Sequence, residues 1–103
     1  MNPTRRLLLA APLLVPRLAR GQSPLKLVAS FSILADMVRE IAGSAAEVAA
    51  IVGPSQDAHA FQARPSDLRL VKGADLVFGH GLGFDPWMDR LVRSAGFAGP
   101  YVR

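Results

Sequence analysis

The two histidines of this chain are the side chains best suited to binding a metal ion. His59 lies in a polar loop, GPSQDAHAFQARP, and His80 follows a short apolar segment. A neutral imidazole in such a loop can coordinate zinc, manganese or another divalent cation. Asp57 can accept a hydrogen bond from the His59 ring and fix its tautomer, but an aspartate after Gly-Pro-Ser equally forms turns. On residue type alone, a single loop histidine is more often solvated or hydrogen-bonded than a ligand.

Other kinds of chemistry find little support in the sequence. The chain contains no cysteine, which excludes disulfides, thiolate ligands and a cysteine-borne lipid anchor within these residues. Gly81 and Gly83 lack the full dinucleotide-binding fingerprint, and no P-loop lysine follows them. Ser32 belongs to no nucleophile-elbow motif and is expected to cap a helix. Asp85 and Asp89 are expected to be solvated or capping charges.

Residues 1–21 have the composition of an export signal. Arg5 and Arg6 precede an apolar run over residues 7–15, and Gln22 is the first residue of the predicted mature chain. The apolar run is too short to span a hydrocarbon core, which needs about twenty residues. Paired arginines occur in both Sec and twin-arginine signals, so the sequence predicts a periplasmic protein without fixing the export route.

The excess positive charge of the chain belongs to this predicted signal. The whole chain carries a formal net charge of +4, whereas from Gln22 onward eight basic residues face eight acidic ones. The predicted mature chain therefore lacks the broad basic composition that a nucleic-acid-binding surface requires, and nucleic acid is not expected as a partner.

Apolar segments along the mature chain alternate between strand and helix patterns. Strands are predicted at 26–30, 47–52, 75–79 and, beginning only, 101–102; helices are predicted at 31–41, 65–72 and 86–94. This alternation predicts an α/β fold, a doubly wound parallel sheet with helices on both faces. Because the last strand has barely begun at Arg103, we expect the rest of a larger protein to be missing.

The first predicted helix is amphipathic. Its apolar positions are expected to face the core, with Ser30 or Ser32 as the N-cap and Gly43 after the last turn. These apolar positions are Ile33, Leu34, Met37, Val38 and Ile41, and those expected to face water are Asp36, Arg39 and Glu40.

The loops at the carboxyl ends of the parallel strands are where a ligand is expected. In open sheets of this kind these loops line the binding crevice. The segments after Ser30, Val52 and Gly79 meet this condition, and both histidines lie in them.

Two stretches resemble a known family: SFSILADMVREIAG and IVGPSQDAHAFQARPSDLRLVKGADLVFGHGLGFDPWMDRL. They are similar to the N-terminal lobe of the zinc and manganese ABC-transporter solute-binding proteins (cluster A-I type, ZnuA-like). The most specific element is the order strand, G-P, polar residues, histidine, aromatic, P-S-D-L, A-D-L-V and a G-L-G-F-D-P-W-like turn. The resemblance covers nearly all of residues 22–103, which are expected to form a truncated N-terminal lobe.

The resemblance implies a transported divalent metal ion, zinc in preference to manganese, and a membrane permease as the partner that receives it, with no catalytic step. His59 corresponds to the first metal ligand of the family, and the other ligands come from later segments and a C-terminal lobe that this chain lacks. A tetrahedral zinc site normally has four ligands, so these residues alone are expected to bind metal weakly. His80 stands where the family usually has asparagine, which leaves a loop-shaping role or an auxiliary role beside Asp57 at the site.

Two alternatives remain open at this point. The chain could be a small exported α/β enzyme or a nonmetal ligand-binding module that uses a crevice between Ser30, His59 and His80. It could also be an inactive remnant, which predicts poor solubility and exposed apolar sheet edges.

Overall fold

The computed structural model describes residues 23–57 and 60–103. The predicted signal, residues 1–21, and His59 both lie outside these ranges. The described elements are β1 (Leu25–Phe31), α2 (Ser32–Ala42), the 3-10 turn η1 (Gly43–Ala45), β2 (Ala46–Val52), α3 (Pro65–Lys72), β3 (Leu76–Phe78), α4 (Trp87–Ser94) and β4 (Tyr101–Val102).

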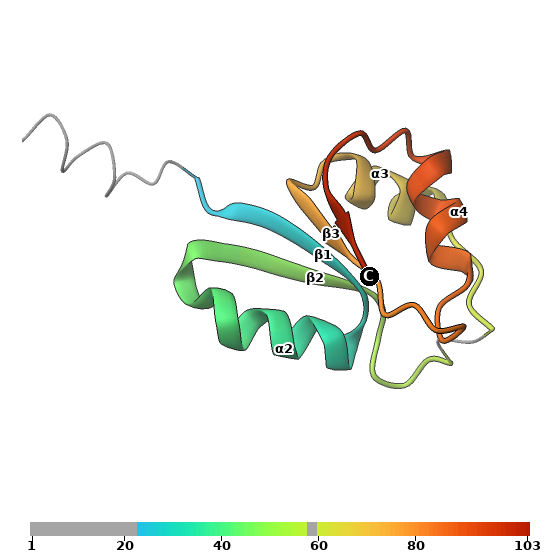
Figure 1. Cartoon of the computed structure of the whole chain (residues 1–103), viewed down its shortest axis with the longest axis horizontal. Helices are drawn as coiled ribbons and strands as arrows, with labels where there is room; N and C mark the ends of the chain where they lie inside the picture. Colours follow the sequence, from blue (N-terminus) through green and yellow to red (C-terminus); the bar gives the residue numbers. More distant parts are fainter. Residues whose placement is uncertain (1–22, 58–59) are drawn as a thin grey trace, which may run out of the picture.

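The strands form one parallel sheet in the order β2-β1-β3-β4. Figure 1 shows α2 on one side of this sheet and α3 and α4 on the other. The predicted α/β class and the doubly wound arrangement are therefore confirmed. The strand order also explains the two helix layers. The chain passes from β1 to β2 in one direction across the sheet and then from β2 back past β1 to β3 in the other. Because both crossovers are right-handed, their helices lie on opposite faces.

The main core lies between the sheet and the α3–α4 layer. Val28 and Val77 come from the two central strands, Val71 from α3, and Met88 and Leu91 from α4. All five side chains are at most 2% exposed. Val71 is thus the buried apolar residue of α3, and Met88 and Leu91 face the same core from α4. No helix within the described ranges is both long and apolar enough to cross a membrane.

The start of α2 differs from the prediction. Phe31 has extended backbone angles, belongs to β1 and occupies the N-cap position without a side-chain cap hydrogen bond. Ser32 is already the first helical residue, and the buried hydroxyl of Ser30 has no hydrogen-bond partner among the described residues. The predicted serine cap is therefore wrong, because β1 extends one residue further than its apolar run suggested. Gly43 follows the helix as predicted.

The buried face of α2 agrees with the prediction at Val38, which is buried, and differs from it at three other apolar positions. Ala35 and Val38 face the sheet, whereas Ile33, Met37 and Ile41 are 66%, 58% and 88% exposed. Ala35 is fully buried, so the side of α2 that contacts β1 and β2 runs through Ala35 and Val38 rather than through the larger apolar residues. The expected exposure of the three charged residues of α2 is confirmed.

The start of α3 follows the sequence closely. Pro65 occupies the first turn, where a missing N–H costs nothing, and the buried carboxylate of Asp67 accepts the Arg64 backbone N–H at 2.8 Å. The Arg64 guanidinium reaches the same carboxylate at 3.2 Å. This capping box fixes the point at which the loop after β2 enters the helix.

Gly79, just after β3, leaves the space that the Tyr101 ring occupies. A Cβ atom at Gly79 would lie 2.8 Å from the tyrosine hydroxyl oxygen and 3.0 Å from a ring carbon. We therefore expect Gly79→Ala to lower the free energy of unfolding by about 1–3 kcal/mol, as overpacking does elsewhere. In urea titrations, Gly53→Ala is the matched control, because its Cβ would meet only Gln56 Oε1 at 3.6 Å. Equal stability of the two variants would contradict this packing argument.

Tyr101 supplies a pH-dependent contribution to stability. Burial, and then the hydrogen bond that its hydroxyl donates to Asp89 Oδ1 at 2.7 Å, raise the pKa of Tyr101 well above its ordinary value. The unfolded chain releases this proton near pH 10, whereas the folded chain retains it. The contribution is therefore fully present below about pH 10 and is lost as pH rises through the folded pKa.

This titration can be observed directly because Tyr101 is the single tyrosine of the chain. Tyrosinate absorbance at 295 nm should rise only above the ordinary pKa of about 10 in the folded chain, and at about 10 in urea. Asp89→Ala should move the folded midpoint back toward the urea value. A folded midpoint at the ordinary value would refute the assigned environment.

Candidate functional site

The carboxyl ends of the four parallel strands meet at one edge of the sheet. The neighbouring strands β1 and β3 lead their chains to opposite faces from this edge, which makes it the topological switch point where open α/β sheets bind ligands. Two loops leave the edge here, residues 53–64 after β2 and residues 79–86 after β3. A hollow of about 230 Å³ lies between the described parts of the two loops, with Gly53 and Asp57 of the first loop and Phe84 of the second among its lining residues.

The loop over residues 53–64 is anchored at both ends. At its start, the Gly53 N–H donates to Gln56 Oε1 at 2.8 Å and closes a turn. At its end, the Phe61 ring packs on Trp87 with the ring centroids 4.9 Å apart, and the Arg64 guanidinium lies 5.7 Å from the Phe61 centroid. The first contact closes a turn at the start of the loop, and the stacking of Phe61 on Trp87 holds the end of the loop against α4.

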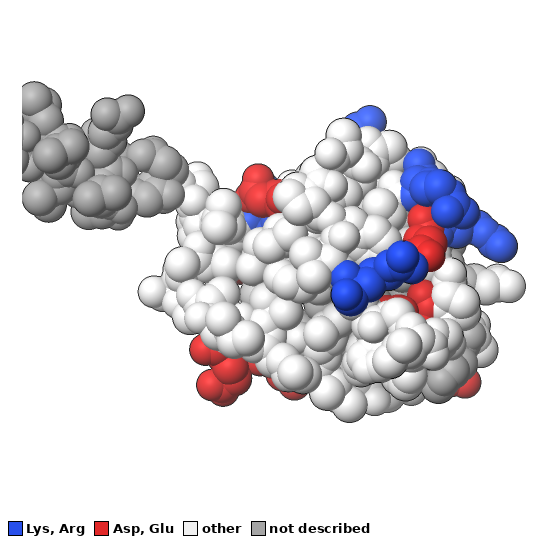
Figure 2. All heavy atoms as spheres, viewed as in Figure 1, with Lys and Arg blue, Asp and Glu red and all other residues white. Residues whose placement is uncertain are grey.

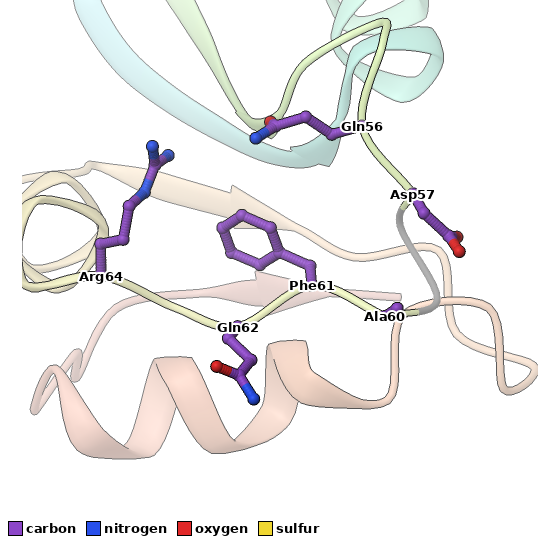
Figure 3. A pocket seen from close by; sticks show the side chains of 6 residues that line it. All are labelled: Gln56, Asp57, Ala60, Phe61, Gln62 and Arg64. Atoms are coloured by element: carbon purple, nitrogen blue, oxygen red, sulfur yellow. The ribbon is translucent and has the colours of Figure 1, made fainter.

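A hollow of about 400 Å³ lies under this loop, lined by Gln56, Asp57, Ala60, Phe61, Gln62 and Arg64. Figure 3 shows the Phe61 and Arg64 side chains on the sheet side of the loop, while the Asp57 carboxylate points away from them. The exposed Asp57 accepts the Ala60 N–H at its backbone carbonyl, at 3.3 Å. Its predicted hydrogen bond to the His59 ring stays a prediction, because His59 is not described.

His80 lies at the same edge, in the loop after β3. Its ring meets Phe31 and Phe84 with centroid distances of 5.8 and 5.1 Å. Its Nδ1 lies 3.1 Å from the Gly81 carbonyl oxygen, a contact expected of a residue that shapes its own loop. When Nδ1 donates this hydrogen bond, the neutral ring keeps its lone pair on Nε2. The exposed ring can therefore offer Nε2 to a group in the crevice.

The loop that carries His80 is held by Asp85, which is 4% exposed. The Asp85 carboxylate accepts the backbone N–H of His80 at 2.7 Å and that of Gly81 at 2.9 Å. The expectation of a solvated or capping charge is wrong for Asp85, since the carboxylate is buried and ties together a loop rather than a helix end. The position of Asp85 directly before Pro86, after a Gly-Leu-Gly turn, is the sequence signal that could have indicated this role.

Asp89 is also more than a solvated charge. It joins the Tyr101 hydroxyl at 2.7 Å to the Arg103 guanidinium at 2.8 Å, and so connects α4 to β4. Neither contact reaches His80 or the loop over residues 53–64. Asp89 therefore supports the sheet behind the crevice.

The described residues do not make a complete metal site. Within 23–57 and 60–103, no group of three or more histidine or acidic side chains is gathered closely enough to hold an ion. The hollow under residues 53–64 has one carboxylate among its lining residues, that of Asp57. The Arg64 guanidinium, which also lines it, is paired with Asp67. The structure brings the described part of the His59 loop and His80 to one edge of the sheet.

Comparison with known proteins identifies the family. The model of the periplasmic zinc-uptake complex component A, ZnuA, matches residues 27–102. The manganese-binding lipoprotein MntA of Halalkalibacterium halodurans is 41% identical over 70 residues, covering 68% of this chain and 23% of that protein. The iron ABC transporter substrate-binding lipoprotein MtsA of Streptococcus pyogenes is 37% identical over 75 residues, covering 69% and 24%. The chain thus spans about a quarter of the length of these curated relatives.

Solved structures agree on the fold. The periplasmic zinc-binding protein TroA from Treponema pallidum has a TM-score of 0.70 at 24% identity, over 78% of this chain and 29% of that one. The periplasmic metal-binding protein from Candidatus Liberibacter asiaticus has a TM-score of 0.68 at 24% identity, over 76% and 29%. With its parallel sheet, its loop after β2 and a family match over nearly all of the described residues, the chain belongs to the ZnuA family of periplasmic metal-uptake components.

Proposed function

We propose that this chain is the N-terminal lobe of the substrate-binding component of an ABC transporter for a divalent transition-metal ion. The observation that supports it most is the family match over residues 27–102, because it spans both loops at the switch point of the sheet. In this proposal the protein captures the ion in the periplasm after export by the Sec or twin-arginine route. It then releases the ion to a membrane permease, with no catalytic step.

His59 is the proposed ligand from this lobe. Its loop starts and ends at the crevice edge, where Gln56 and Phe61 anchor the flanking residues. Asp57 and His80 are proposed as auxiliary groups that orient a ligand, His80 through the lone pair on Nε2. The other ligands would come from a C-terminal lobe that closes over the same edge, because one imidazole binds a divalent ion weakly.

Zinc is the ion that we propose ahead of manganese. Imidazole suits zinc, whereas added carboxylates favour manganese, and His59 is the ligand proposed here. The relatives are named for manganese and iron, and TroA for zinc, so the family alone does not choose the metal.

The proposal is tested on the polypeptide as its host exports it. Mass spectrometry gives its first residue and its length, and calorimetric titration with zinc, manganese and magnesium gives the affinity for each ion. We expect a product starting near Gln22 and considerably longer than 103 residues, with zinc bound most tightly and magnesium not bound. Binding of none of the three ions would contradict the proposed function.

A further inference from the structure

Ser30 carries a buried hydroxyl that no group satisfies in the part of the chain that the structure describes. Three polar or charged side chains are buried there, those of Ser30, Asp67 and Asp85. The two carboxylates accept backbone N–H groups, whereas Ser30 Oγ has no hydrogen-bond partner. Figure 2 shows charged side chains on the outside of the molecule, near α2 and around α4, and none of them bonds this hydroxyl. A buried hydroxyl without a partner costs free energy that an alanine in its place would not.

Ser30 is the last residue of β1 that faces the main core. Side chains alternate along a strand, so Ser30 faces the same side of the sheet as Val28, which belongs to the core under α3 and α4. The next residue, Phe31, ends the strand and contacts the ring of His80. Since β1 is a central strand, the hydroxyl lies at the carboxyl edge, beside the switch point of the sheet.

The loop over residues 53–64 passes over this end of the same face. Its Phe61 and the first residue of α4, Trp87, both border the main core and pack on each other with centroids 4.9 Å apart. Figure 3 shows the Phe61 ring on the sheet side of its loop. The unsatisfied hydroxyl is therefore on the side of the sheet toward the loop that supplies the ligand proposed above.

A serine hydroxyl has the chemistry to orient a ligand at this place. An imidazole that binds a metal ion through one ring nitrogen donates the N–H of the other to an acceptor, which fixes the ring. The oxygen of a hydroxyl can accept such a bond. We propose that Ser30 is a positioning residue of the metal site, whose hydroxyl accepts the ring N–H of the imidazole that this lobe supplies when the ion is bound. The inference rests on the proposed function.

Ser30→Ala in the exported polypeptide tests this role with two measurements. Calorimetry should show zinc binding about tenfold or more weaker than in the native protein, as the loss of such a partner typically causes. In a chelator, the midpoint of urea unfolding should not fall, because alanine removes a hydroxyl that has no partner to lose. Ser94→Ala, at an exposed serine that ends α4, is the matched control and should change neither quantity.

Ser30→Thr keeps the hydroxyl and should restore most of the zinc affinity that alanine loses. Unchanged zinc affinity in Ser30→Ala, with zinc bound by the native protein, would overturn the role of Ser30 and leave the proposed function. A fall of the urea midpoint in the chelator would overturn it too, since the hydroxyl would then already have a partner. A loss of affinity in Asp57→Ala but not in Ser30→Ala would assign the ring N–H to the Asp57 carboxylate instead. A native protein that binds no zinc would overturn both proposals.

Discussion

Replacing His59 by alanine should weaken zinc binding by the exported protein at least about hundredfold, which corresponds to about 2.8 kcal/mol of binding free energy. The reason is the loss of one of the four ligands that a tetrahedral zinc site normally uses. Stability without metal should change little, because a histidine in a polar loop segment of the sequence is not expected to contribute to the core. Calorimetry with zinc and urea unfolding in a chelator measure the two quantities.

The second histidine of the chain provides the matched control. His80→Asn replaces one imidazole at the same sheet edge and leaves the backbone hydrogen bonds to Asp85 in place. Since auxiliary groups contribute less than ligands, we expect His80→Asn to weaken zinc binding by less than about tenfold. Unchanged zinc affinity in His59→Ala, or a larger loss in His80→Asn, would remove His59 from its proposed role.

Replacing Asp85 by alanine should lower the free energy of unfolding by about 3 kcal/mol. The substitution leaves the part-buried N–H groups of His80 and Gly81 without their acceptor, and an unsatisfied group costs about 1–3 kcal/mol when it is fully buried. Small domains have about 5–15 kcal/mol in total, so a large part of the stability would be lost. Urea unfolding can be followed by the fluorescence of Trp87, the single tryptophan of the chain.

Two variants sharpen this second prediction. Asp85→Asn keeps one acceptor oxygen but turns an NH2 group toward a backbone N–H. We therefore expect it to lower the free energy of unfolding by less than Asp85→Ala does, but by more than zero. Asp89→Ala removes the bonds to Tyr101 and Arg103, of which the Arg103 pair is solvent-exposed and worth at most about 1 kcal/mol. An equal decrease in the free energy of unfolding for Asp85→Ala and Asp89→Ala would contradict the larger contribution expected of the buried Asp85 carboxylate.

Most of the fold could be predicted because its elements follow local rules. The apolar runs of β1 and β2, the Pro65 start of α3 and the Gly43 end of α2 are each determined within a few residues of chain. The boundaries then differ by only one or two residues, as at Phe31. The orientation of α2 could not be predicted in the same way, because periodicity shows that a helix has an apolar side without showing what covers that side. Its sheet contact uses the smaller Ala35 and leaves Met37 exposed.

The site could be predicted only in part, for a related reason. The resemblance to the family indicates His59, and the rule for parallel sheets indicates the edge where its loop lies. The contacts that shape this edge join residues far apart in the chain, such as Phe31 with His80 and Phe61 with Trp87. The role of Asp85 was missed because a carboxylate that serves backbone donors looks, in a sequence, like any charge before a helix.

The anchoring of the loop after β3 by Asp85 has a consequence for how this protein can vary. The carboxylate accepts the backbone N–H groups of His80 and Gly81, so these two hydrogen bonds do not depend on which side chain stands at position 80. Asparagine, histidine or glutamate at this position would be presented from the same point of the crevice edge. Position 80 is thus a place where natural divergence or a designer can change the side chain at the crevice edge while Asp85 keeps its two hydrogen bonds to the loop backbone.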